Sequence, residues 1–502
     1  MKKFLQFFSF AAMTQVILLL NQVVLLPMQI RLWGSAETAL WYAAIALATV
    51  TTVADCGLRT AGHVELLQLV RAKDPAAQAE FRQVWAWIRL LVVSVTAALL
   101  LGDLAYGHWH GMGEWQLGRA LLTLAYAMET VLIIRIVYLD SLGEYSRAES
   151  SYFTFAAVRL VLAVPALLVF RVHSIGLCWL FLGTSALGLV LQGWVCHIPE
   201  ALHLFARFPR QFSARTLALV RYTMAEPCAN WVRLSLPVLV IASIAPATAV
   251  TTYVALRAIY GAARTTIQQV ARVASVEVLR LRAAGRKDTA ESLLSLFMLL
   301  AAFIGTALAG VVALDNLRLL SLWLKHFDHV LFQNINLSFA LSSPFYAYQV
   351  IVALSFRIGQ LAVMARRQYA YLAYSSVFAG AAFITRSLPV YLGLLVVAEI
   401  TLSLSFMARQ NIGGKLGFTT RAGWRGLTGS FAGTLLVAAL WMTVRFAGTN
   451  VFSQTSPADA LQTLSLLAAG LGVLLLSGLA VNAGMLRSLR VAMRRPVSIV
   501  SA

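Results

Sequence analysis

The fold is decided by residues 9–62, SFAAMTQVILLLNQVVLLPMQIRLWGSAETALWYAAIALATVTTVADCGLRTAG. Two long apolar runs in this stretch meet at a short turn around Trp33 and Gly34. A helix of about 20 residues rises about 30 Å, which matches the hydrocarbon core of a bilayer. Because lipid satisfies no backbone polar group, we predict that both runs are transmembrane helices.

The composition extends this prediction to the whole chain. Of its 502 residues, 60% are hydrophobic and 12% are charged, and the mean hydropathy is +0.78. A soluble protein of this composition would expose far larger apolar patches than soluble proteins tolerate. The apolar runs are near 20 residues long rather than alternating ten-residue segments, which favours helices over a barrel. The sequence therefore predicts an all-α integral membrane protein.

The positions of the basic residues indicate the topology. We predict about 14 transmembrane helices, at residues 9–30, 38–58, 84–102, 118–138, 150–170, 174–196, 217–243, 248–272, 292–314, 334–362, 369–385, 388–408, 428–447 and 461–482. With a cytoplasmic N-terminus, 30 of the 40 Lys and Arg residues belong to the cytoplasmic gaps and tails, and only seven to the outer gaps. This bias follows the positive-inside rule and places both termini in the cytoplasm. The net charge of +20 is then a topology signal, and we expect no nucleic-acid partner.

The helix order suggests an internal repeat. Pro237 and Tyr253 follow Pro27 and Tyr42 by 210 and 211 residues, and six predicted spans lie on each side of a basic loop. Transporters are often built from such repeats. We therefore predict two pseudo-symmetric bundles around a central cavity, with these boundaries: a six-helix bundle at 1–196, a basic cytoplasmic linker at 197–216, a second six-helix bundle at 217–408, two additional helices at 409–482 and a basic cytoplasmic tail at 483–502.

Three arginines fall in the middle of predicted spans: Arg159, Arg233 and Arg257. Facing lipid, they would cost about 8 to 10 kcal/mol together, so they must face the protein interior. One interpretation pairs them in buried salt bridges with the mid-span acids Glu129, Glu226 and Glu399. The other is a basic, water-filled cavity for an anionic ligand, because guanidinium binds phosphate through a planar, bidentate fork.

Other polar residues share helical faces with these arginines. Asn230 lies between Glu226 and Arg233 on one face of its span, and a stripe on the next span contains Tyr253, Arg257, Tyr260 and Arg264. Gln22 belongs to a row of amides on the first helix. Tyrosine rings offer apolar faces and hydroxyls together, which suits a ligand that also carries sugar.

The N-terminal pattern resembles that of a known family. Leu32-Trp33-Gly34, Glu37, Trp41-Tyr42 and Asp55-Cys56-Gly57-Leu58 are similar to the start of the Wzx-type flippases of bacterial polysaccharide biosynthesis. These proteins belong to the MOP superfamily, with the MATE drug exporters and the lipid II flippase. The resemblance implies a multi-pass protein of the bacterial inner membrane. It also implies that the protein moves undecaprenyl-pyrophosphate-linked oligosaccharides to the periplasmic leaflet, for surface polysaccharide or exopolysaccharide.

The same resemblance implies roles for particular residues. In related flippases arginines line a central cavity, and Arg59 and Arg257 fall at comparable places here. Many relatives have an acid where this chain has Arg233. We expect Arg59, Arg233 and Arg257 to bind the pyrophosphate with Arg159 in support, and the remaining substrate contacts to come from Tyr253, Tyr260, Arg264, Asn230 and Gln22.

Transport in such a protein needs a driving force. We expect coupling to a proton or sodium gradient, with Asp55, Glu129 and Glu226 as candidates, and neither a cofactor nor a metal site. The expected partners are the lipid-linked oligosaccharide, membrane lipid, a polysaccharide polymerase and a chain-length regulator.

Three other functions fit the sequence less well. A MATE-like drug exporter shares the fold, but its cavity usually needs acids to bind cations. A membrane-embedded polymerase or glycosyltransferase typically needs a large outer domain or catalytic outer loop, whereas the outer gaps here are short and lack paired acids. A scaffold has little use for mid-span arginines. No P-loop motif is present, so we predict a transporter that is neither an enzyme nor an ATPase.

Overall fold

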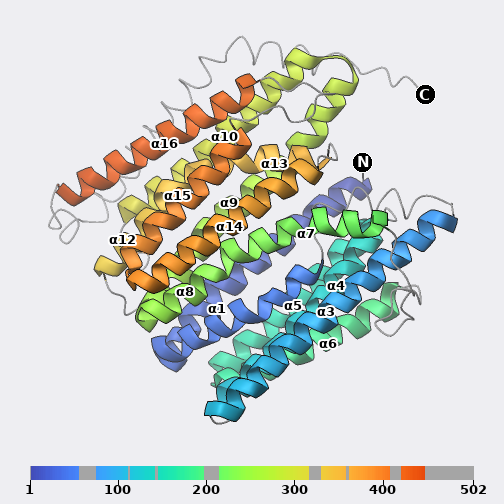
Figure 1. The fold of residues 1–502 in the computed structure, drawn as a ribbon, viewed down its shortest axis with the longest axis vertical. Helices are drawn as coiled ribbons and strands as arrows, with labels where there is room; N and C mark the ends of the chain where they lie inside the picture. The colour runs from blue at the N-terminus through green and yellow to red at the C-terminus, as the bar shows by residue number, and fades with distance from the viewer. Residues whose placement is uncertain are drawn as a thin grey trace. The chain divides into compact units, whose positions relative to one another are not determined.

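The computed structural model describes residues 2–55, 75–110, 113–141, 145–196, 214–315, 329–357, 361–407 and 420–446. These residues are almost entirely helical and contain no strand (Figure 1). Within the described ranges, nine helices are long and apolar enough to cross a membrane. The predicted class, an all-α membrane protein, is confirmed. The count of 14 stays a prediction, because the last predicted span, 461–482, lies outside the described residues.

The chain divides into two compact units. The first contains Met1–Ala258, Trp323–Asp328 and Leu361–Tyr391, and the second contains Ile259–Leu322, His329–Gln360 and Leu392–Ala502. The two predicted six-helix bundles and their boundaries stay a prediction.

The described part of the first unit contains ten helical elements and also the first four residues of α15, Leu388–Tyr391. They are α1 (Lys2–Ala48), the 3-10 helix η1 (Thr49–Asp55), α3 (Pro75–His110), α4 (Glu114–Ser141), α5 (Tyr145–Leu168), α6 (Ser174–Cys196), α7 (Ala214–Leu234), α8 (Leu236–Ile244), the start of α9 (Ala247–Ala283) and α14 (Leu361–Thr385). The predicted turn near Trp33 is present within α1, where Gly34 has a φ of 80° and a ψ of 175°. Glycine adopts this left-handed φ without steric cost, so the two apolar runs are separated here.

Large buried side chains fill the space between α1, α4, α5 and α6. Trp41 is 1% exposed, and its ring meets the edges of Trp33 and Phe181 with ring centroids 5.6 Å apart in both pairs. Leu122 of α4 and Leu167 of α5 belong to the same cluster. This packing places the polar residues of these helices in a water-poor, low-dielectric interior, where every charge needs a partner.

The predicted span 217–243 is two helices rather than one. α7 ends at Leu234 and α8 begins at Leu236, because Pro237 removes a backbone donor at the start of α8. One hydrogen bond connects the region of this break to η1, and another connects it to α1. The Ser235 and Thr49 hydroxyls lie 3.0 Å apart, and the indole N–H of Trp231 donates to the Ala46 carbonyl at 3.0 Å.

The second unit contains the rest of α9, α10 (Lys287–Asp315), α12 (His329–Ser342), the 3-10 helix η3 (Ser343–Ala347), α13 (Tyr348–Arg357), most of α15 (Leu388–Met407) and α16 (Thr420–Phe446). The predicted span at 334–362 overlaps a candidate membrane span at Val330–Ser355, in which η3 interrupts the helix at Pro344. Hydroxyl groups satisfy the carbonyls freed by the break. Ser430 donates to Pro344 at 2.9 Å, and Thr434 donates to Leu341 at 3.2 Å.

Glycine allows α10 to reach this break. A Cβ atom on Gly305 would lie 2.2 Å from the Ser343 carbonyl oxygen, so no larger residue fits without displacing the backbone. The Ser343 hydroxyl donates back to the Gly305 carbonyl at 2.9 Å. The break is therefore a packed and hydrogen-bonded part of the second unit.

Candidate substrate-binding site

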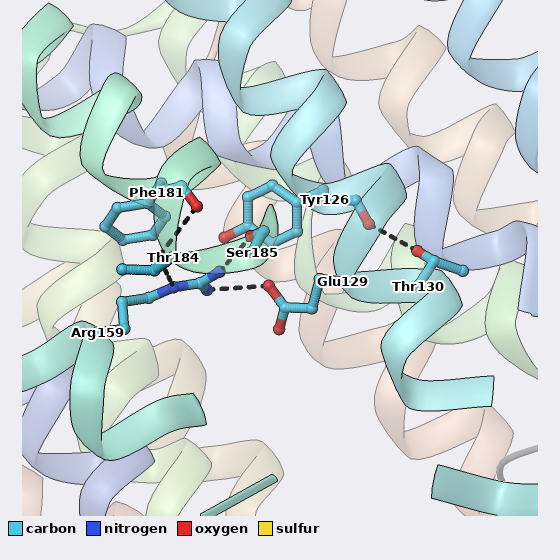
Figure 2. Close-up of polar contacts among 7 residues, drawn as sticks. All are labelled: Tyr126, Glu129, Thr130, Arg159, Phe181, Thr184 and Ser185. Atoms are coloured by element: carbon cyan, nitrogen blue, oxygen red, sulfur yellow. Dashed lines mark hydrogen bonds and ion pairs between the residues drawn. The ribbon is translucent and has the colours of Figure 1, made fainter. Parts of the chain in front are cut away.

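Arg159 of α5 makes three polar contacts inside the first unit (Figure 2). Its Nη1 donates to Glu129 Oε2 of α4 at 2.9 Å. Its Nη2 donates to the Ser185 hydroxyl at 2.7 Å, and its Nε donates to the Thr184 hydroxyl at 3.4 Å. Both hydroxyls belong to α6. The guanidinium charge is thus neutralised by one carboxylate and fixed by two hydroxyls.

Two aromatic rings complete the surroundings of this arginine. The guanidinium carbon lies 4.3 Å from the ring centroid of Phe155 and 4.6 Å from that of Phe181. The side chain of Arg159 is 7% exposed. The salt-bridge interpretation therefore describes Arg159, and an anion would have to displace Glu129 in order to bind there.

Arg257 of α9 has different neighbours. Its Nη1 donates to the carbonyl of Leu234, the last residue of α7. This carbonyl is available because the helix stops there, and its negative end favours a cation. The hydroxyls of Tyr42, Tyr126 and Tyr253 lie within electrostatic range of the guanidinium. Arg257 is half-buried, and no carboxylate of the described residues forms an ion pair with it.

Tyr126 connects these two arginines. It lies on α4 three residues before Glu129, and the Thr130 hydroxyl donates to its carbonyl at 2.8 Å (Figure 2). Its own hydroxyl is within electrostatic range of Glu129, Arg159 and Arg257. Arg159 and Arg257 therefore belong to one polar interior, which is formed by α1, α4, α5, α6 and α9.

Arg233 of α7 contacts an aromatic residue outside the predicted site. Its guanidinium carbon lies 4.9 Å from the ring centroid of Tyr371 on α14. Tyr374 meets Tyr371 edge to face with ring centroids 5.3 Å apart, and Tyr391 lies near Tyr371 and Tyr253. The sequence did contain a signal, since tyrosines at 371 and 374 share a face of the predicted span 369–385.

Three further predicted residues also lie in the first unit. Glu226 and Asn230 are half-buried on α7, on the helix that carries Arg233. Asp55 ends η1 and lies within electrostatic range of Cys228 on α7. The structure thus brings one candidate coupling acid to the helix that carries another.

The other predicted residues are not among the contacts described above. Tyr260 and Arg264 belong to the second unit, where the Tyr260 hydroxyl lies 2.9 Å from Asn336 Oδ1 and its ring stacks on Phe339 with centroids 5.2 Å apart. Gln22 lies on α1, and its side chain is outside the description. Arg59 lies outside the described residues.

Solved structures provide the comparison with known proteins. No protein-family model matches the chain, and no curated protein sequence matches it. The lipid II flippase MurJ in an inward closed conformation is 12% identical, with a TM-score of 0.62, 94% of this chain covered and 99% of that one. The eukaryotic MATE transporter AtDTX14 is also 12% identical, with a TM-score of 0.55 and coverages of 86% and 99%.

A third structure shares this architecture. It is an inward-facing multidrug resistance MATE family transporter of the MOP superfamily, 14% identical, with a TM-score of 0.52 and coverages of 84% and 99%. At such identities the likeness is one of fold. The chain therefore has the fold that MATE transporters of the MOP superfamily share with the lipid II flippase MurJ.

Proposed function

We propose that this protein is a Wzx-type flippase that moves undecaprenyl-pyrophosphate-linked oligosaccharides from the cytoplasmic to the periplasmic leaflet. The observation that carries the proposal is the environment of Arg257. Its guanidinium has one carbonyl acceptor and three nearby phenols, and none of the described carboxylates pairs with it. A pyrophosphate offers the two-pronged acceptor that such a guanidinium binds best.

Energetics support a ligand at this position. A mid-membrane arginine costs about 2.5 to 3.5 kcal/mol on insertion scales. At Arg159 the chain offsets that cost with Glu129, Ser185 and Thr184. At Arg257 the described residues supply neutral oxygen atoms, and a bound anion would add a negative charge beside them.

The proposed roles follow from these surroundings. Arg257 binds the pyrophosphate, and Arg233 and Arg59 contribute further positive charge. The phenols of Tyr42, Tyr126 and Tyr253 orient the phosphate oxygens by hydrogen bonding. Arg159 supports the site through Glu129 and Tyr126 rather than by direct contact.

Coupling to an ion gradient is part of the proposal. Glu129 is one candidate coupling residue, because its carboxylate lies 2.9 Å from Arg159 and within electrostatic range of Tyr126. Asp55 and Glu226 are the further candidates. Alternating access of the site to the two sides of the membrane would complete the transport cycle.

A MATE-like drug exporter is the second candidate, and the fold supports it as well as it supports a flippase. Such an exporter binds organic cations, which require an acid that is free to accept them. Glu129 is an acid in the described polar interior around Arg257, and it is already paired with Arg159. This observation favours an anionic over a cationic substrate.

A reconstituted transport assay tests the proposal. Proteoliposomes would receive fluorescent undecaprenyl-pyrophosphoryl N-acetylglucosamine, and loss of the inner-leaflet signal would be followed with a membrane-impermeant quencher. We expect transport by the wild type, about 100-fold slower transport by Arg257→Gln because a charged hydrogen-bonded contact is lost, and normal transport by Arg147→Gln. Arg147 is the matched control, an exposed arginine on α5.

The same assay identifies the rival function. Transport of a quaternary ammonium dye by the wild type, with no movement of the lipid, would replace the flippase proposal with the exporter. Equal lipid transport by Arg257→Gln and the wild type would remove Arg257 from the site.

A further inference from the structure

A cavity of about 360 Å³ lies among α1, α4 and α6 of the first unit. Its lining includes Glu37 of α1, Glu114 and Trp115 at the start of α4, and His173 and Ser174 at the start of α6. Glu114 and His173 are exposed, so this space, here named the acidic cavity, opens to the surface of the unit.

The acidic cavity is separate from the arginines of the polar interior. Glu114 is the first residue of α4, and Tyr126, which lies near Arg159 and Arg257, follows it by 12 residues. At about 1.5 Å of rise per residue, this spacing is about 18 Å along the helix. A ligand in the acidic cavity would therefore occupy a second site, which does not depend on the proposed flippase function.

Both carboxylates of the acidic cavity are available to a ligand. Neither Glu37 nor Glu114 forms an ion pair with another described residue. Glu37 accepts one hydrogen bond, from the backbone N–H of Ser174 to its Oε1 at 3.4 Å. This bond is longer than usual, and a carboxylate has about four acceptor positions, so most of its capacity stays open.

Helix capping explains these carboxylates only in part. Acids stabilise the first turn of a helix, and Glu114 and Glu37 are placed to do this for α4 and α6. Each helix start carries about half a positive charge. The three starts at the cavity, of α4, α6 and the segment of α1 after Gly34, therefore offer about 1.5 positive charges together, against two full negative charges. Of the described lining residues, none is Lys or Arg, so the cavity favours a cation.

The other lining groups favour an organic cation over a metal ion. No group of three His, Cys, Asp or Glu side chains that could hold a metal ion occurs in the described part of the chain. Instead, the indole of Trp115 and the aliphatic side chains of Leu40 and Ile175 share the lining with the carboxylates. Aromatic faces attract ammonium groups. The volume is also within the range of small-molecule sites, which is about 300 to 1,000 Å³.

We propose that the acidic cavity binds an organic ammonium group. Glu37 and Glu114 supply the negative charge, and Trp115 contacts the carbon substituents on the nitrogen. Such groups occur in free amines such as choline and in lipid headgroups such as that of phosphatidylcholine. The site adds recognition of a cation to a protein whose proposed substrate is an anion.

Choline binding tests this proposal. Radiolabelled choline would be titrated into the purified full-length protein in maltoside micelles, with 3,3-dimethyl-1-butanol, an uncharged molecule of the same shape, as competitor. We expect saturable binding that the neutral alcohol does not displace. Glu37→Gln and Glu114→Gln should each weaken binding about fivefold, because each removes one charge. Trp115→Leu should weaken it about threefold.

Matched variants separate the acidic cavity from general effects. Asp288→Asn removes an exposed carboxylate from the first turn of α10, outside the cavity lining, and should bind choline like the wild type. Glu37→Gln keeps an oxygen that can accept from Ser174, and Trp115→Phe keeps an aromatic face and should lose less than Trp115→Leu. Melting temperatures would confirm that all variants are folded.

A second competitor identifies the source of the ammonium group. Displacement of choline by short-chain phosphatidylcholine at lower concentrations than by unlabelled choline would support the site and assign it to a lipid headgroup. Weaker displacement would support the site and assign it to a free amine.

Four results would overturn the proposal. They are absence of saturable choline binding, equal displacement by choline and the neutral alcohol, unchanged binding in all the cavity variants, and displacement by Mg²⁺ at lower concentrations than by choline. None of them would affect the flippase proposal, which the lipid transport assay tests separately.

Discussion

Arg159 and Arg257 lie in the same unit and share a tyrosine neighbour, yet their environments differ. Arg159 contacts a carboxylate, two hydroxyls and two aromatic rings. Arg257 contacts a helix-terminal carbonyl and lies near three phenols. Both are mid-span arginines in the sequence, with the same insertion cost. The comparison shows that the partner, rather than the depth in the membrane, separates a structural arginine from a candidate ligand-binding one.

Removing the carboxylate that pairs with Arg159 should have the largest effect. We expect Glu129→Gln to destabilise the protein by about 3 to 5 kcal/mol, because it leaves Arg159 buried beside a neutral group. The measurement is thermal unfolding in detergent. The double variant Glu129→Leu with Arg159→Met should recover most of that stability, since it removes both charges. An unchanged melting temperature in Glu129→Gln would remove the distinction between the two arginines.

A charge-preserving change at the other arginine should act on binding instead. Arg257→Lys keeps the positive charge but loses the planar fork, so affinity for undecaprenyl pyrophosphate should fall about 30-fold, or about 2 kcal/mol. Its melting temperature should stay close to that of the wild type. A stability loss as large as that of Glu129→Gln would mean that Arg257 is structural too.

A smaller change tests the hydroxyls around the paired arginine. Ser185→Ala deletes the acceptor of the 2.7 Å bond from Arg159 and should cost about 1.5 kcal/mol of stability. Ser150→Ala, an exposed hydroxyl on α5, is the control and should change stability by less than about 0.5 kcal/mol. Equal melting temperatures for both variants would show that Glu129 alone stabilises Arg159.

The smallest effect is expected at the phenols around Arg257. Tyr42→Phe removes one hydroxyl near the guanidinium, and affinity for undecaprenyl pyrophosphate should fall about threefold. Tyr152→Phe is the control, since Tyr152 is packed beside Phe155 in the hydrophobic cluster of the unit. Tighter binding in Tyr42→Phe would mean that the phenol competes with the ligand for Arg257.

Part of this arrangement could be predicted from the sequence. Gly34 and Pro237 interrupt helices where single residues dictate backbone geometry. The pairing of Arg159 with a mid-span acid was one of two open interpretations. The cost of burying a charge requires a partner, but it does not identify which residue or ligand that partner is. Which arginine pairs depends on how α4, α5 and α6 pack, and spacing along one helix does not contain that information.

Two other features could not be predicted from the sequence, for a different reason. The carbonyls of Pro344 and Leu341 accept hydrogen bonds from hydroxyls 86 and 93 residues further along the chain, so a hydropathy window shows an unbroken apolar run. Tyr371 and Tyr374 have the spacing of ordinary core residues. Only the contact between Tyr371 and Arg233 of another helix indicates a role beyond packing.

The distant compensation of η3 has a consequence for biogenesis. Leu341 and Pro344 emerge from the ribosome before Thr434 and Ser430 have been synthesised, so their carbonyls enter the membrane without these donors. An unpaired carbonyl in hydrocarbon costs several kcal/mol. Nascent chains that stop short of α16 should therefore be preferred substrates for membrane quality-control proteases, and pulse-chase lifetimes should rise sharply once translation passes residue 434.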